Sequence, residues 1–199
     1  MISSNSDVGG GPNHMFMLGE NLNNSFKVYY AVPKNNNFTK CLNFKNYIQI
    51  SEREINIRDI INLIKFIRKN SIDIVHAHGK GAGAIARLTN LFYKTKLIYT
   101  FHGIHVECHN FLMNLIYIFY ENIFGKIDDY KIFVSESEKI YAKNLNIILW
   151  NKTCVINNGV KNKLIKNKNE DIDLLNKNDS SKITVVSTCR FVKQKNIKE

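Results

Sequence analysis

The sequence predicts an α/β fold, namely a Rossmann-like parallel sheet with helices on both faces. Short apolar runs alternate with longer segments whose apolar residues recur at helical spacing. Polar motifs follow the ends of the apolar runs, and they lie at residues 76–79, 100–103, 157–160 and 190–195. Open sheets of this class bind ligands at the carboxyl ends of their strands, so these motifs are the first candidates for a functional site.

The elements are expected in the following order. Residues 1–2 are the end of a strand, and a glycine-rich loop at 9–11 leads into a helix that begins near Pro12, since proline suits a first helical turn. A strand at 27–33 and a polar loop at 34–40 follow. Strands and helices then alternate, with strands at 72–75, 96–99, 130–134 and 155–156 and helices at 58–68, 79–92 and 109–124.

Side-chain types support these assignments. The helix at 58–68 has a wide apolar face, and small residues in 79–92 indicate a helix packed closely on the sheet. The helix at 109–124 is apolar nearly all round, for which core packing is the favoured interpretation. After the strand at 130–134, either Ser135 or Ser137 is expected to cap a helix.

Three regions are expected along the chain. Residues 1–160 form a Rossmann-like N-terminal domain, and residues 161–181 are polar, lack periodicity and are typical of a linker. Residues 182–199 begin with a new apolar strand at 183–187 and contain the first strand and loop of an incomplete second domain. A lone strand cannot close a sheet of its own.

Composition narrows the function classes. The formal charge is +11, from 28 basic and 17 acidic residues, which is compatible with nucleic-acid or anionic-membrane binding. No arginine-rich run or aromatic-basic interleaving occurs, and lysine, asparagine and isoleucine are abundant together, so we favour compositional bias and expect no nucleic-acid partner.

The cysteines and the apolar runs bear on localisation. The four cysteines form no Cys-x-x-Cys pair, which is typical of reduced thiols in a cytosolic protein. The start lacks the pattern of a signal peptide, and the longest apolar stretch, at 111–120, is far shorter than the ~20 residues of a membrane span. We therefore expect a cytoplasmic protein, with peripheral binding at the inner membrane face as an alternative.

Histidines dominate two of the motifs. His76 and His78 lie two residues apart, hence on the same side of an extended strand, and His102 and His105 follow the next strand. Zinc sites usually include cysteine or carboxylate partners at regular spacing, which these motifs lack, so no metal site is predicted. A histidine at a strand's carboxyl end is better interpreted as a hydrogen-bond donor to ligand oxygens. A buried core histidine is the alternative, and it has more weight at His76 than at His102.

Two further features of the sequence are suited to binding phosphate groups. Backbone amides of a glycine-rich loop before a helix can hold a phosphate at the positive helix end, although an ordinary tight turn has the same composition. Arg190 and Lys195 flank the loop after the last strand, and a guanidinium with an ammonium is suited to a diphosphate. Taken alone, these two residues are better interpreted as a solvated basic tail.

In combination these motifs resemble the family 4 glycosyltransferases of GT-B fold. The resemblance runs over nearly the whole chain and rests on the order and spacing of the glycine loop, Asp-Ile-Val-His-Ala-His at 73–78, Thr-Phe-His-Gly at 100–103, Val-Ser-Glu-Ser at 134–137, Val-Ile-Asn-Asn-Gly-Val at 155–160 and the basic pair. It implies two Rossmann-like domains that face a cleft. It also implies sugar transfer from a nucleotide-sugar donor with retention of anomeric configuration, without a cofactor or a required metal.

The resemblance also implies roles for individual residues. His102 matches the histidine that contacts the donor sugar and is the catalytic candidate. Arg190 and Lys195 match the pair that holds the diphosphate. The other donor-binding or acceptor-binding candidates from the matched motifs are Gly9, Gly10, Gly11, His76, Gly103, Asn158 and Gly159.

The chain departs from the family at both ends. The E-x(7)-E motif of the second domain is absent, and only Met1 and Ile2 remain of the first strand. We therefore expect a chain truncated at both ends, which is a glycosyltransferase for polysaccharide or glycolipid acceptors by resemblance but inactive on its own. The alternative functions are a non-catalytic partner or membrane-binding subunit, which would use the helix at 109–124, and, less favoured, a histidine metal hydrolase.

Overall fold

A computed structural model describes residues 1–5, 9–22, 25–34, 46–104, 111–149 and 152–159. The chain divides into two compact units, Met1–Gly159 and Val160–Glu199. The expected linker at 161–181, the strand at 183–187 and most of the loop at 34–40 lie outside the described residues.

Parallel pairing joins the strands, as the sequence predicts. They are β1 (Tyr30–Pro33), β2 (Tyr47–Ile50), β3 (Ile74–His78), β4 (Lys96–Thr100), β5 (Tyr130–Phe133) and β6 (Lys152–Val155). One group has the order β3-β4-β5-β6, and the other pairs β1 with β2. Ile2 bridges Ala31 of β1 and Ala77 of β3, so the expected strand end at the start of the chain joins the two groups.

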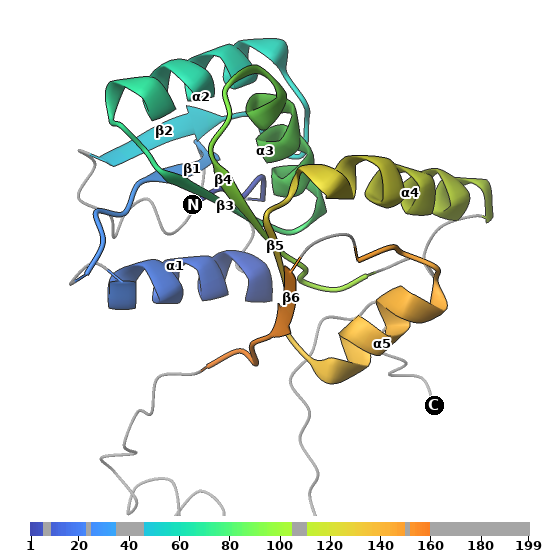
Figure 1. Cartoon of the computed structure of the whole chain (residues 1–199). Helices are drawn as coiled ribbons and strands as arrows, with labels where there is room; N and C mark the ends of the chain where they lie inside the picture. The colour runs from blue at the N-terminus through green and yellow to red at the C-terminus, as the bar shows by residue number, and fades with distance from the viewer. Residues whose placement is uncertain (6–8, 23–24, 35–45, 105–110, 150–151, 160–199) are drawn as a thin grey trace, which may run out of the picture. The chain divides into compact units, whose positions relative to one another are not determined.

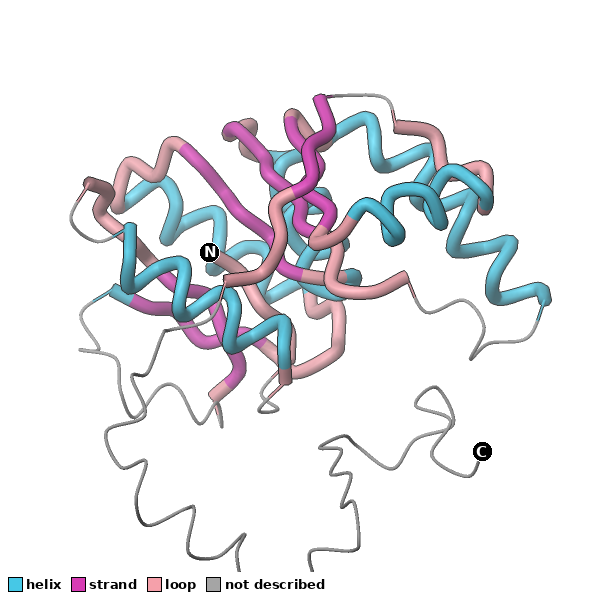
Figure 2. The backbone as a smooth tube through the Cα atoms, turned by 90° about the horizontal axis from the view of Figure 1, so that it is seen from below, coloured by secondary structure: helices cyan, strands magenta, loops and turns pink. Residues whose placement is uncertain are grey.

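Helices alternate with these strands. They are α1 (Gly10–Leu22), α2 (Ile57–Lys69), α3 (Lys80–Phe92), α4 (Phe111–Phe124) and α5 (Glu136–Asn144), with a short 3₁₀ helix, η3 (Gly125–Ile127), after α4. In Figure 1, α1 lies on one side of the strands and α2 and α3 lie on the other. Figure 2 shows the same strands in magenta and helices in cyan from below. The predicted α/β class with a parallel sheet and alternating helices is confirmed.

Some boundaries differ from the sequence prediction. The strand expected at 72–75 runs instead over Ile74–His78, so both histidines of its motif lie inside β3. The reason is that β3 has a hydrogen-bonded neighbour on each side: the Ile2 amide donates to the His76 carbonyl, and the strand pairs with β4 through His78 and Thr100. In addition, β2 was not predicted, and β6 occupies Lys152–Val155 rather than 155–156.

The core lies where α3 covers the middle strands. Tyr99 and Phe101 are almost fully buried, and the Phe101 ring stacks on Phe133 with centroids 4.7 Å apart. A Cβ atom at Gly83 would lie 2.8 Å from the Tyr99 ring, so α3 packs closely on β4, as its small residues predict. The helix cap is also confirmed, because the Ser135 hydroxyl accepts from the Glu138 amide at the start of α5.

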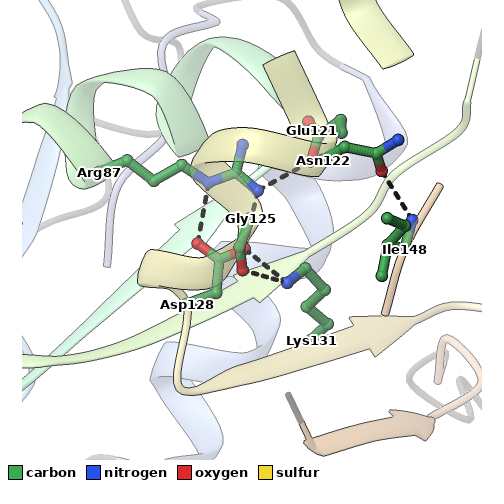
Figure 3. Close-up of polar contacts among 7 residues, drawn as sticks. All are labelled: Arg87, Glu121, Asn122, Gly125, Asp128, Lys131 and Ile148. Carbon is green, nitrogen blue, oxygen red and sulfur yellow. Dashed lines mark hydrogen bonds and ion pairs between the residues drawn. The ribbon is translucent and has the colours of Figure 1, made fainter. Parts of the chain in front are cut away.

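A buried ionic cluster, which the sequence did not predict, joins α3 and α4 to the sheet. Arg87 of α3 bonds to both carboxylate oxygens of Asp128 at 2.8 and 2.7 Å, and to Glu121 of α4 at 2.8 Å. Lys131 of β5 lies 3.2 Å from Asp128. Figure 3 shows these side chains pointing toward one another. Burial disfavours the charge of Arg87, but its hydrogen bonds to Asp128 and its attraction to both acids outweigh burial and raise its pKa.

The apolar face of α4 is exposed. Glu121 is the buried residue of this helix, whereas the following large apolar side chains are exposed: Phe111, Leu112, Met113, Leu115, Ile116, Phe119 and Ile123. Tyr117 and Ile118 of α4 pack against the core, so the expectation of core packing holds for one side of the helix and is wrong for the exposed residues. The spacing of apolar residues indicates which face of a helix disfavours contact with water, but it does not identify the neighbour that packs against that face. Within the described residues, no helix is long and apolar enough to cross a membrane.

Candidate functional site

The candidate site lies at the carboxyl ends of the central strands. Ile2 runs beside the end of β3, β3 runs beside β4, and the chain enters α1 soon after Ile2. Three segments far apart in the sequence therefore converge: the start of α1, the end of β3 and residues 101–104 after β4. This is the edge of an open α/β sheet where ligands are expected.

Three histidine rings form the centre of the site. The His78 Nδ1 and His102 Nε2 atoms lie 3.1 Å apart and share a hydrogen bond. The ring of His14, from the first turns of α1, lies edge-on to His102 with centroids 5.1 Å apart. His78 is buried, whereas His14 and His102 are partly exposed, so the cluster is open to solvent on one side.

The glycine-rich loop borders His102. A Cβ atom at Gly11 would lie 3.4 Å from His102 Cγ, so a glycine here permits the close approach of α1 to that ring. Among the described residues, a Cβ atom at Gly10 would have no neighbour within 4 Å, and one at Gly9 would meet Pro12 at 3.9 Å. Amides in the first turn of a helix have no partner within that helix, so this loop is suited to bind a phosphate.

Glu138 holds the loop after β4 in place. Gly103 has a φ of 98°, in the region that favours glycine, and its amide donates to Glu138 Oε1 at 2.6 Å. The other oxygen of Glu138 accepts from the Val134 amide at 3.1 Å. One carboxylate on α5 thus fixes the turn that follows His102.

His76 has a partner within the protein. Its Nε2 atom lies 2.7 Å from the Thr100 hydroxyl, and its ring is buried beside His78 with centroids 4.1 Å apart. These surroundings are those of the core-histidine alternative, and ligand contact by His76 stays a prediction.

The remaining candidates are less enclosed or outside the description. Asn158 and Gly159 are exposed in the segment that follows β6. Arg190, Lys195 and His105 lie outside the described residues. Of the predicted site residues, the described structure brings together Gly11, His102 and Gly103.

Burial keeps the histidines of the site uncharged. It lowers the pKa of His102 to about 4, with a further contribution from the positive form of His14, and lowers the pKa of His76 to about 3. Burial also lowers the pKa of His78 well below its usual value and lowers that of His14. At neutral pH each ring is therefore a neutral imidazole with one donor and one acceptor nitrogen.

Sequence reasoning missed two residues of the site. His14 lies on a helix that was identified only by its apolar spacing, and no motif pointed to it. Glu138 stands three residues after the cap Ser135, a capping-box spacing that predicts a carboxylate turned back toward the helix start. That signal could have indicated Glu138, but its bond to Gly103 depends on how α5 packs.

Solved structures of other proteins share the fold of this chain. HepE of Anabaena in complex with UDP-glucose aligns with a TM-score of 0.69 and 14% identity, over 87% of this chain and 47% of HepE. The complex of HepE with UDP and glucose aligns with a TM-score of 0.63 and 12% identity, over 80% of this chain and 43% of HepE. A glycosyltransferase from Rickettsia africae aligns with a TM-score of 0.60 and 20% identity, over 80% of this chain and 42% of that protein.

These likenesses show the fold, which matches the N-terminal part of GT-B glycosyltransferases, and the chain spans less than half of the length of these structures. A sequence search of curated proteins found no match. Residues 8–163, more than half of the chain, match the family model described as Glycosyltransferase Family 4. The chain therefore belongs to glycosyltransferase family 4.

Proposed function

We propose that this chain is the acceptor-side half of a retaining glycosyltransferase that transfers a sugar from a nucleotide-sugar donor to a polysaccharide or glycolipid acceptor at the cytoplasmic face of the membrane. The observation that carries the proposal is the contact between Gly11 and His102 at the carboxyl edge of the sheet. It brings a helix start, which favours phosphate, next to a histidine that can contact a sugar hydroxyl.

The proposed chemistry follows from charge. When the glycosidic bond of the donor breaks, negative charge grows on the departing nucleoside diphosphate. The amides at the start of α1 and the cations Arg190 and Lys195 would stabilise that charge. His102, neutral at the pH of the cell, would donate or accept a hydrogen bond at the sugar without adding a charge of its own. The HepE complexes make UDP-glucose the first donor to test.

The second domain belongs to the proposal as well. Residues 182–199 would be the first strand and loop of the nucleotide-sugar-binding domain, after a linker at 161–181. Because positioning both substrates supplies a large part of the rate enhancement, the 199-residue chain alone is proposed to be inactive. The extended enzyme, meaning this chain joined to a second domain that carries the family's E-x(7)-E motif, is the form in which transfer is tested.

The diphosphate contact gives the first test. In the extended enzyme, Arg190→Ala is expected to weaken UDP binding by about tenfold or more, because a hydrogen bond to a charged group contributes roughly 1.5–3 kcal/mol. Isothermal titration with UDP measures the effect. Arg58→Ala, at an exposed arginine of α2, is the matched control and should leave the affinity unchanged. Equal affinity of the Arg190 variant and the parent would mean that the basic pair is merely solvated.

A second candidate function is supported by α4. The exposed apolar face of α4, together with the net charge of +11, favours peripheral binding to an anionic membrane. The apolar side chains of α4 would enter the membrane–water interface, and the helix would not cross the bilayer. This role is compatible with transfer to a lipid-linked acceptor, and it would persist if the chain were a non-catalytic partner subunit.

Vesicle binding tests this role. The chain is expected to sediment with vesicles of phosphatidylcholine and phosphatidylglycerol, and Phe119→Glu should reduce the bound fraction by about tenfold or more, because burying a phenylalanine contributes about 1.5–3 kcal/mol. Phe92→Glu on α3 is the control, since Phe92 is 76% exposed and Phe119 is 66% exposed. Equal loss in both variants, or no sedimentation with the vesicles, would contradict the membrane role.

A further inference from the structure

We propose that His14, His78 and His102 form a three-nitrogen site for a zinc ion, with a fourth coordination position open to solvent. The three histidines each offer one ring nitrogen, and these nitrogens all lie within 4.8 Å of one another. This inference goes beyond the proposed sugar transfer, for which the family resemblance implies no metal.

The distances between the three histidine nitrogens are close to those of a zinc site, so only a small movement is needed on binding. In a tetrahedral zinc site with bonds of about 2.0–2.1 Å, neighbouring ligand nitrogens lie about 3.3 Å apart. The His78 Nδ1 and His102 Nε2 atoms are already 3.1 Å apart. His14 is the ring that must approach, and its side chain is partly exposed on a helix surface, where a rotation about its side-chain bonds can supply the movement.

The polar bonding of the rings also favours a ligand. Among the described residues, the His14 Nδ1 atom is buried and has no hydrogen-bond partner. An unsatisfied buried polar atom costs about 1–3 kcal/mol, and coordination of an ion by this nitrogen would satisfy it. His76 is different, because its Nε2 atom is engaged by Thr100, and it is therefore not a ligand in this proposal.

The chemistry of the donor set selects the ion. Neutral imidazole is the ligating form of histidine. Imidazole nitrogens suit zinc, whereas magnesium and calcium prefer oxygen ligands. Three histidines with an open position are a ligand set that zinc enzymes use, so cysteine or carboxylate partners are not required.

The site has a consequence for transfer that rests on the proposed function. A zinc ion on His102 would lie against the ring that is proposed to meet the donor sugar. Zinc and UDP-glucose are then expected to exclude each other in the extended enzyme. Zinc binding is measured on the 199-residue chain without any transfer assay, so failure of the proposed sugar transfer leaves that measurement intact.

The experiment is a zinc titration of the 199-residue chain against a chromophoric chelator. One zinc per chain is expected, and His14→Ala should weaken the affinity by at least about tenfold, since even the loss of a group that only orients a ligand costs 10–100-fold. His14 is chosen because a partly exposed helix position tolerates the change, whereas His78→Asn in the central strand has a greater risk of unfolding. Circular dichroism verifies that the variants are folded.

Two controls define the outcome. Cys154→Ser removes an exposed thiol that could bind zinc adventitiously, and it should leave the affinity unchanged. Magnesium chloride in place of zinc should show no binding. X-ray absorption of the zinc-loaded chain should show three imidazole nitrogens. No stoichiometric zinc on the parent chain, or an affinity that survives His14→Ala, would overturn the proposal.

Discussion

Replacing Arg87 with methionine is expected to lower the free energy of unfolding by about 3–5 kcal/mol, because it leaves two buried carboxylates without their shared partner. Arg87 is 1% exposed, and it is the side chain that bonds to both Glu121 and Asp128. Lys131 would remain beside Asp128, but it cannot reach across to replace the pair of bonds that the guanidinium makes.

Urea denaturation followed by circular dichroism measures this change. Arg87→Lys serves as the second variant, and it should fall between the parent and Arg87→Met because it keeps the charge but loses the two-pronged bond to Asp128. Arg58→Ala, at an exposed arginine of α2, should change the free energy of unfolding by less than about 0.5 kcal/mol. A loss of under 1 kcal/mol for Arg87→Met would show that the cluster is not needed to hold α3 and α4 on the sheet.

His102→Ala is expected to lower the turnover of the extended enzyme by about 10²–10³-fold, the usual cost of removing one group that contacts the transition state. The structure allows this change with little damage to the fold. His102 is partly exposed, and the interaction lost within the protein is the hydrogen bond to His78. That bond contributes about 0.5–1.5 kcal/mol, and the melting temperature should fall by only a few degrees.

Steady-state rates with UDP-glucose separate the possible outcomes. The 199-residue chain is the baseline and should show no transfer. His102→Gln keeps an amide donor near the position of the ring nitrogen, so it should recover part of the lost rate if the donor contact matters. If the His102→Ala enzyme kept full activity, His102 would have no role in the reaction. If it unfolded, the role of His102 would be structural.

The α/β class followed from signals that act over a few residues. Alternating apolar runs and helical spacing are local, and the cap at Ser135 needs only a serine before the first helical turn. Parallel pairing was predictable because helices separate successive strands in the chain. The position of His102 was predictable for the same reason, since it directly follows an apolar strand.

Contacts between distant segments could not be predicted in this way. His14 meets His78 and His102 because Ile2 pairs with β3, and a single bridging residue has no periodic signal in the sequence. Likewise, Arg87, Glu121 and Asp128 look like three ordinary surface charges on separate elements until those elements pack. The apolar character of α4 was evident from the sequence, but the sequence did not show whether other parts of the protein cover its apolar face.

The sequence by itself therefore determined the fold class and the family, and it indicated the edge of the sheet at which the candidate site lies, because each depends on local pattern and on the order of motifs. Only the tertiary structure decided which side chains share that site and which charges are buried. Those depend on strand order and helix packing, which bring residues 24 to 41 positions apart into hydrogen-bond contact.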